Sequence, residues 1–128
     1  MVEFDYTVES SRGFDETVAA VEAKSVEAGF KALAVHDVKA TLESKGFAQA
    51  PMKIIEICNA KYVHQVLAKD VKIALMLPCP VVVYFRKGKI LISTLRPKVI
   101  ADFYPAAGVG EIAAEVDKIV LSIVDEAR

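Results

Sequence analysis

Three side chains in this sequence, those of His36, Cys58 and Cys79, can bind a soft metal ion or take part in redox chemistry. Cys58 ends an apolar run and precedes a helical pattern. Cys79 stands just before the apolar run 81–85, and His36 closes the run 32–35. Each residue therefore lies at or near the end of an expected strand, where binding and catalytic groups are often found.

Cys58 has two interpretations. Asn59 is a good N-cap for a helix over 60–69, which would put Cys58 one residue outside a helix N-terminus. The helix dipole and free backbone N–H groups there favour a thiolate, which would make this cysteine reactive. Alternatively, Cys58 is a small buried hydrophobe at the end of a strand, because free cysteines are among the most buried residues.

Cys79 and His36 are similarly open to two interpretations. Pro78 and Pro80 restrict the backbone around Cys79, which suits a ligand or a nucleophile and equally suits a turn into an edge strand. Asp37 follows His36 and could orient an imidazole. Neighbours along a strand point to opposite faces, however, so a structural or solvent-facing histidine is the alternative.

His36, Cys58 and Cys79 are only a weak signal for a metal site. The sequence has no C-x₂-C pair, and the spacing of these three residues matches no zinc finger or zinc ribbon. Three ligands, His36, Cys58 and Cys79, would resemble an open catalytic site for a soft divalent metal such as zinc. Glu56 shares the strand face of Cys58 and could join them, as could Asn59. No glycine-rich phosphate loop or nucleophile elbow is present.

Composition narrows the class of protein. The length of 128 residues predicts one domain over 1–128. A hydrophobic fraction of 54% is high for a small soluble chain and predicts that part of the apolar surface is buried in a homodimer. A net charge of −1 gives no support to nucleic-acid binding. The acidic start, the short apolar runs and the two cysteines predict a cytoplasmic protein with free thiols, without signal peptide or membrane span.

The periodicity predicts an α+β fold with a single sheet covered on one face by helices, in the order β-α-β-(short α)-β-α-β-β-α. Its other face would be available for the dimer. Residues 71–77 have no clear assignment, and 99–107 are expected to be irregular. The expected strands are 2–8, 31–37, 52–58, 80–86 and 89–95, and the expected helices are 13–29, 38–45, 60–69 and 109–126.

The two cysteines are expected at the same end of the sheet. Cys58 ends one strand and Cys79 begins a later one. If the strands are antiparallel, these two ends coincide, whereas parallel strands would separate the thiols. The short helix between them and the extended return favour the first arrangement. This predicts sulfurs close enough to share a metal ion or form a disulfide, with His36 in the same cleft if its strand also ends there.

A series of short motifs runs along the chain. They are Val35-His36-Asp37-Val38, Leu42, Lys45-Gly46, Ile54-Ile55-Glu56-Ile57-Cys58-Asn59, Leu67, Asp70 and Leu77-Pro78-Cys79-Pro80-Val81-Val82-Val83-Tyr84. This pattern resembles the family catalogued as domain of unknown function 302, although Ala60 stands where the family often has proline, and Asp70-Val71 where it often has Asp-Pro. The resemblance implies a topology like that of the TATA-binding protein, a homodimer and no established activity. It makes His36, Glu56, Cys58, Asn59 and Cys79 the positions to test together.

Three functions remain open from the sequence. The first is a module that binds a metal or small ligand through His36, Cys58 and Cys79. The second is a thiol-based redox enzyme in which Cys58 attacks, Cys79 resolves and His36 acts as the base. The third is a structural dimer module without a site. Whether the two thiols and the imidazole converge distinguishes among them.

Overall fold

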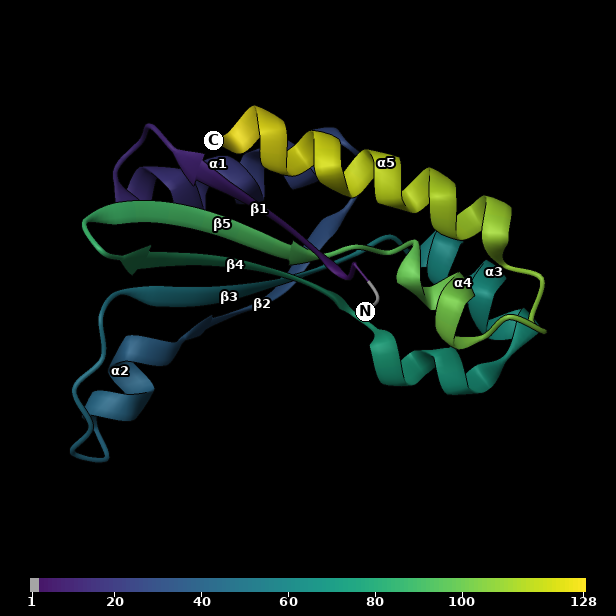
Figure 1. The fold of residues 1–128 in the computed structure, drawn as a ribbon, viewed down its shortest axis with the longest axis horizontal. Helices are drawn as coiled ribbons and strands as arrows, with labels where there is room; N and C mark the ends of the chain where they lie inside the picture. Colours follow the sequence, from purple (N-terminus) through teal and green to yellow (C-terminus); the bar gives the residue numbers. More distant parts are fainter. Residues whose placement is uncertain (1–2) are drawn as a thin grey trace.

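The computed structural model describes residues 3–128 and contains one antiparallel sheet of five strands in the order β1-β5-β4-β3-β2. Helices α1 and α5 lie across one face of this sheet, as Figure 1 shows. The strands are β1 (Asp5–Ser10), β2 (Lys31–Asp37), β3 (Met52–Cys58), β4 (Cys79–Arg86) and β5 (Lys89–Leu95). The helices are α1 (Phe14–Glu27), α2 (Val38–Glu43), α3 (Ala60–Lys69), the 3₁₀ helix η1 (Val71–Met76), α4 (Val99–Phe103) and α5 (Gly110–Ala127).

The main core lies between the sheet and the two long helices. Along β4 buried and half-buried residues alternate, so that Cys79, Val81 and Val83 face the helices, as the two-residue period of a strand requires. The apolar stripe of α5 packs onto the same core, where Val120 and Ile123 are almost completely buried. Burial of these aliphatic side chains is the main force that holds the helices on the sheet.

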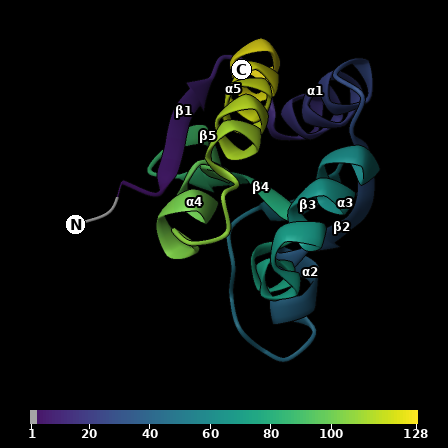
Figure 2. The same cartoon turned by 90° about the vertical axis from the view of Figure 1, so that its right-hand side faces the viewer.

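A second, smaller core closes one end of the sheet. We call the segments α3, η1 and α4 the end cap. Figure 2 shows the end cap from the side on which α3 lies in front. It packs around a cluster of buried residues that consists of Val66, Ile73 and Ile100 together with Val109, which lies just before α5. The end cap is joined to the main core through Ile112 of α5, which packs against both clusters.

Most of the elements expected from the sequence are confirmed, and β2, β3 and α3 have the expected bounds. The first strand was expected over 2–8 and is found at Asp5–Ser10; Val2 lies outside the described residues. The strand runs on to Ser10 because the pairing with β5 continues to Ser10 opposite Ile90, and the buried Ser10 hydroxyl bonds that of Thr17 at 2.8 Å.

The expectation that 99–107 is irregular was wrong for its first half. Residues Val99–Phe103 form α4, which follows Pro97. The backbone N–H of Lys98, at the N-cap position, donates to the carboxylate of Asp117 in α5. Side-chain capping from a distant helix therefore stabilises a turn that local periodicity does not reveal.

Candidate functional site

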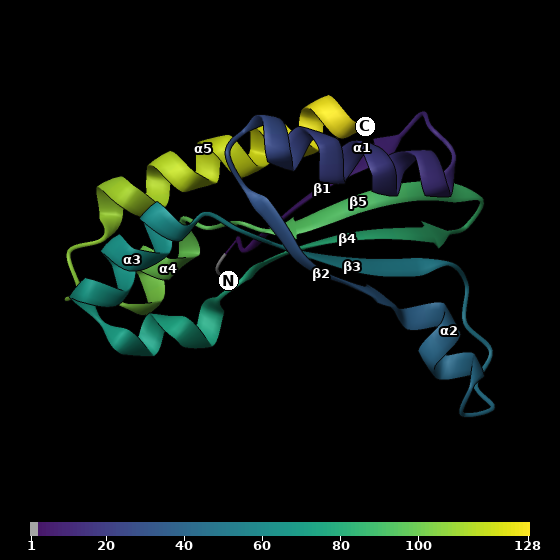
Figure 3. The same ribbon diagram turned by 180° about the vertical axis from the view of Figure 1, so that it is seen from behind.

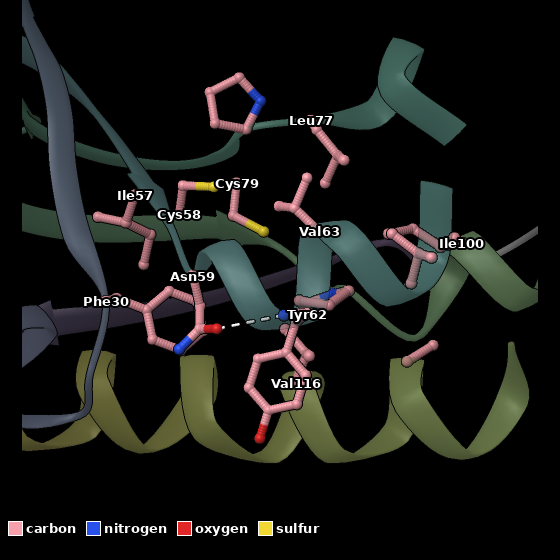
Figure 4. A pocket seen from close by; sticks show the side chains of 14 residues that line it. Phe30, Ile57, Cys58, Asn59, Tyr62, Val63, Leu77, Cys79, Ile100 and Val116 are labelled. Atoms are coloured by element: carbon pink, nitrogen blue, oxygen red, sulfur yellow. Dashed lines mark hydrogen bonds between the residues drawn. The ribbon is translucent and has the colours of Figure 1, made fainter. Parts of the chain in front are cut away.

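The strand pairing brings the two cysteines to the same end of the sheet. β3 and β4 are antiparallel, with Ile57 opposite Cys79, so Cys58 lies one position further along β3. Both cysteines line one pocket between the sheet and the end cap, which we call the thiol pocket (Figure 4). The prediction that the thiols share an end of the sheet is therefore confirmed. The exact separation of their sulfurs stays a prediction.

The thiol pocket is small and largely apolar. It encloses about 30 Å³, and its lining is drawn from β3, β4 and the end cap together with α5. Leu77 and Pro78, which are joined by a cis peptide bond, carry the chain from η1 to Cys79. The remaining apolar walls include Phe30, Tyr62, Val66, Ile100 and Val116.

Asn59 fixes the backbone beside Cys58. Its side-chain oxygen accepts a hydrogen bond from the N–H of Tyr62 at 3.2 Å, which caps α3 as the sequence predicts. Its side-chain NH₂ group donates to the carbonyl of Gly29 at 2.9 Å. Gly29 has a φ of 84°, a conformation that glycine adopts most readily. Both ends of the Asn59 amide therefore have protein partners, and the residue positions Cys58.

Both thiols are shifted toward their protonated forms. Burial, followed by repulsion from a thiolate at Cys58, raises the pKa of Cys79 from 9.0 to about 11. Burial also raises the pKa of Cys58. The helix N-terminus was expected to favour a thiolate at Cys58, but the loss of hydration has the larger effect on its pKa. The site thus holds two protonated thiols at neutral pH.

His36 does not lie beside the two thiols. In the β2–β3 pairing Cys58 stands opposite Lys31 and His36 opposite Ile54, so His36 lies at the other end of β2. Five residues of strand separate these positions, which corresponds to about 16 Å. His36 was expected in the same cleft only if its strand also ended there. β2 instead enters the sheet at the thiol end and leaves it at the far end, so this condition is not met, and His36 is not among the residues that line the pocket.

His36 is instead paired with Glu56. Its Nε2 lies 2.7 Å from Oε1 of Glu56, and both side chains are partly exposed. Asp37 was considered as the group that orients this imidazole. It instead accepts a hydrogen bond from the N–H of Ala40 and caps α2. Glu56 and His36 thus form a pair of their own, and neither lines the thiol pocket, although Glu56 stands only two residues before Cys58 on β3.

The expected three-ligand zinc site is not assembled by this arrangement. Within residues 3–128, no group of three or more His, Cys, Asp or Glu side chains is placed to hold a metal ion. Zinc in proteins takes at least three such ligands. A metal ion in the thiol pocket would have only two sulfur ligands from the protein. It would therefore have to be an ion that is stable with two ligands.

Sequence reasoning missed the aromatic part of the pocket. Phe30 and Tyr62 lie with ring centroids 6.4 Å apart, and the hydroxyl of Tyr62 donates to Glu115 of α5 at 2.9 Å. Tyr62 could have been found from its spacing, since it stands four residues before Val66 on the helix face that lines the pocket. Phe30 carries no such signal, because it lies in the connection between α1 and β2.

Comparisons with known proteins agree with the fold. The model of the family described as "Domain of unknown function DUF302" matches residues 6–127. The crystal structure of an uncharacterised conserved DUF302 protein from Bacillus stearothermophilus is similar, with 31% sequence identity and a TM-score of 0.93 over 99% of this chain and 100% of that one. No curated protein matches. In the part of the chain that the structure describes, none of the helices combines the length and apolar character needed to cross a bilayer.

Proposed function

This chain belongs to the DUF302 family, and we propose that it is a binding module for one soft monovalent metal ion, of the Cu(I) type, held between Cys58 and Cys79. One observation carries the proposal. Two cysteines that are distant in the sequence line the same small pocket, whose other walls are almost entirely apolar. Thiolate sulfur is the donor that soft ions such as Cu(I) prefer.

The size of the pocket limits what it can bind. An apolar cavity of about 150 Å³ binds benzene, whereas the thiol pocket has a volume of only about 30 Å³. Water would fit, but an ordered water needs two or more polar partners. The amide of Asn59 and the hydroxyl of Tyr62 are already engaged elsewhere. A single soft atom between the sulfurs fits both the volume and the chemistry.

The number of donors favours a monovalent ion. Cu(I) and Ag(I) accept two thiolates in a near-linear arrangement, whereas zinc in proteins takes at least three ligands. Binding would displace a proton from each thiol, so the affinity should increase as the pH rises toward the pKa of Cys79, about 11. The apolar walls would keep water and competing ligands away from the bound ion. A reducing compartment such as the cytoplasm, where free thiols persist, is the setting that suits this proposal.

The redox function is the second candidate, because both thiols line the thiol pocket. Cys58 lies one position from the residue opposite Cys79, and neighbouring residues of a strand face opposite sides of the sheet, so a disulfide would require the end of β3 to rearrange. The raised pKa of both thiols counts against rapid exchange, because the thiolate is the attacking species. We therefore rank this function below metal binding.

A titration of the reduced protein with Ag(I), a redox-inert substitute for Cu(I), tests the proposal. The expected result is one ion per chain, with release of protons and with loss of binding in Cys58→Ser and in Cys79→Ser. His36→Ala is the matched control and should bind like the wild type, because His36 lies at the other end of β2. A parallel titration with Zn(II) should show much weaker binding.

Binding that survives both serine variants would overturn the metal proposal. So would binding that disappears in His36→Ala. Treatment with a mild thiol oxidant separates the second candidate. An intramolecular disulfide that forms readily, in a protein that does not bind Ag(I), would favour the redox function.

A further inference from the structure

The two thiols of the thiol pocket differ in their access to solvent. Cys58 is partly exposed, whereas Cys79 is only 8% exposed and belongs to the main core. A single water needs at least about 10–15 Å³ of space, so the thiol pocket, at about 30 Å³, has no room for an ion together with its shell of water. An ion in solution therefore reaches Cys79 only when a wall of the pocket moves.

Among the elements that line the pocket, α3 is the one least firmly held. β3, β4 and α5 contribute buried side chains to the main core. The buried residue of α3, Val66, instead packs in the smaller cluster of the end cap. In Figure 3 α3 lies below α5 and descends away from it. Segments with only a small core of their own open more readily than the rest of a protein, so α3 is the wall that we expect to move.

The side chain of Tyr62 bridges α3 and α5. Its ring lines the thiol pocket, packs against the main core and lies near Phe30, with ring centroids 6.4 Å apart. Figure 4 shows this ring extending from α3 toward α5. Its hydroxyl donates a hydrogen bond of 2.9 Å to the carboxylate of Glu115 on α5. That bond, followed by burial, raises the pKa of Tyr62, so the hydroxyl remains a donor at neutral pH.

We propose that the hydrogen bond between Tyr62 and Glu115 is a latch, which holds α3 over the thiol pocket and sets how fast an ion reaches Cys79. When the bond breaks, the first turn of α3 moves away from α5 and the inner thiol becomes accessible. The bond is exposed, and water competes for both of its partners, so it breaks and re-forms readily. This inference rests on the proposed function, because it concerns the entry of the ion into that same site.

The other polar contacts of this region do not tie α3 to α5. The hydroxyl of Tyr104 donates to the carbonyl of Lys72 at 2.8 Å, which joins α4 to η1 within the end cap, and Tyr104 does not line the thiol pocket. The bonds of Asn59 hold the point where the chain leaves β3. Among residues 3–128, the bond from Tyr62 to Glu115 is thus the only side-chain hydrogen bond between α3 and α5 that the structure records.

Alkylation of Cys79 by iodoacetamide tests the latch without any metal ion. In a Cys58→Ser background Cys79 is the only thiol. In that background Glu115→Ala should speed the alkylation about fivefold, because one hydrogen bond that opposes opening is lost. Glu115→Gln keeps an acceptor for the hydroxyl and should react at close to the rate of the background. Tyr62→Phe should react as fast as Glu115→Ala, and the two changes together should give no further increase, because both remove the same bond.

Tyr104→Phe is the matched control for the loss of a hydroxyl group. It removes one hydrogen bond within the end cap and leaves the latch intact, so the rate of alkylation should not change. Urea unfolding is measured for each variant. An acceleration in Glu115→Ala that is matched by an equal loss in the free energy of unfolding would overturn the inference, because it would report opening of the whole protein. Equal acceleration in Tyr104→Phe, or none in Glu115→Ala, would also overturn it.

Stopped-flow mixing with Ag(I) connects the latch to the proposed function. With both cysteines present, Glu115→Ala should take up and release Ag(I) faster by the same factor and keep the same Kd, since Glu115 does not line the thiol pocket. A protein that binds no Ag(I), but in which Glu115→Ala speeds alkylation of Cys79, would contradict the proposed function and support the latch as a control of access to the thiol. A protein that binds Ag(I), with neither rate changed in Glu115→Ala, would overturn the latch alone.

Discussion

The guanidinium group of Arg96 holds the carboxylate of Asp117 through two hydrogen bonds, of 2.9 Å and 3.3 Å. Asp117 also accepts the N–H of Lys98 at 3.2 Å, so one carboxylate joins the end of β5, the start of α4 and the middle of α5. The side chains of Arg96 and Asp117 are only 19% and 9% exposed. This ion pair therefore connects the end cap to the main core from a largely buried position.

Removal of the carboxylate at Asp117 is expected to destabilise the fold. Asp117→Ala leaves the Arg96 charge and the Lys98 N–H without a partner, which should lower the free energy of unfolding by about 3 kcal/mol. Urea unfolding measures the change. Glu27→Ala, which breaks the exposed pair with Lys24, is the matched control and should cost less than about 1 kcal/mol. Equal effects of the two variants would contradict the role given to Asp117.

Variants of Asn59 should separate its two hydrogen bonds. Asn59→Ala loses both the cap of α3 and the bond to Gly29, with an expected cost of about 2 kcal/mol. Asn59→Asp keeps the capping oxygen and loses the donor, so its stability should lie between those of the wild type and Asn59→Ala. Chemical denaturation gives the order. If Asn59→Asp proved less stable than Asn59→Ala, the separate contributions assigned to the two hydrogen bonds would be contradicted.

The stability of the protein should fall in alkaline solution because of Cys79. Its pKa is 9.0 when unfolded and about 11 when folded, so the unfolded chain loses this proton first as the pH rises. The contribution is complete below pH 9 and is lost between pH 9 and 11, by roughly 2–3 kcal/mol. Unfolding measured at several pH values should show a shallower decline in Cys79→Ser, because serine does not titrate there. If the free energy of unfolding declined equally with pH in the wild type and in Cys79→Ser, the burial of the Cys79 thiol would be contradicted.

The two cysteines should differ in their rate of alkylation. Cys58 is partly exposed, whereas Cys79 is 8% exposed with the higher pKa, so Cys58 should react first. Both should react more slowly at neutral pH than a free thiol, because burial raises the pKa of each. Mass spectrometry of Cys58→Ser and Cys79→Ser over time gives the two rates. Faster modification of Cys79 would contradict the placement of the thiols.

The sequence predicts the elements well where the periodicity is long or a cap is specific. Asn59 marks the start of α3 because its side chain accepts a hydrogen bond from the N–H of Tyr62, one of the free N–H groups in the first turn of the helix. α5 is evident from its apolar stripe. α4 is not, because its position depends on Asp117, which lies in another helix. Such a contact is fixed only when the chain is folded.

For the site, the sequence indicates the two thiols but not their distance from His36. Strand ends can be predicted from the residues, whereas the end of the sheet to which each strand brings its side chains depends on topology. β2 runs away from the thiol end, so the two termini of β2 have different neighbours: Lys31 stands opposite Cys58, and His36 stands opposite Ile54. The connection from α1 decides this direction, and no residue pattern within β2 records it.

The presence of two separate cores has a consequence for local opening. The end cap packs around its own cluster of Val66, Ile73, Ile100 and Val109, and the thiol pocket lies along the boundary between that cluster and the main core. Segments with their own small core often open as a unit while the rest of the protein stays folded. An occupant of the boundary holds both sides together, so it should slow amide hydrogen exchange across α3 and α4 while leaving the centre of the sheet unchanged.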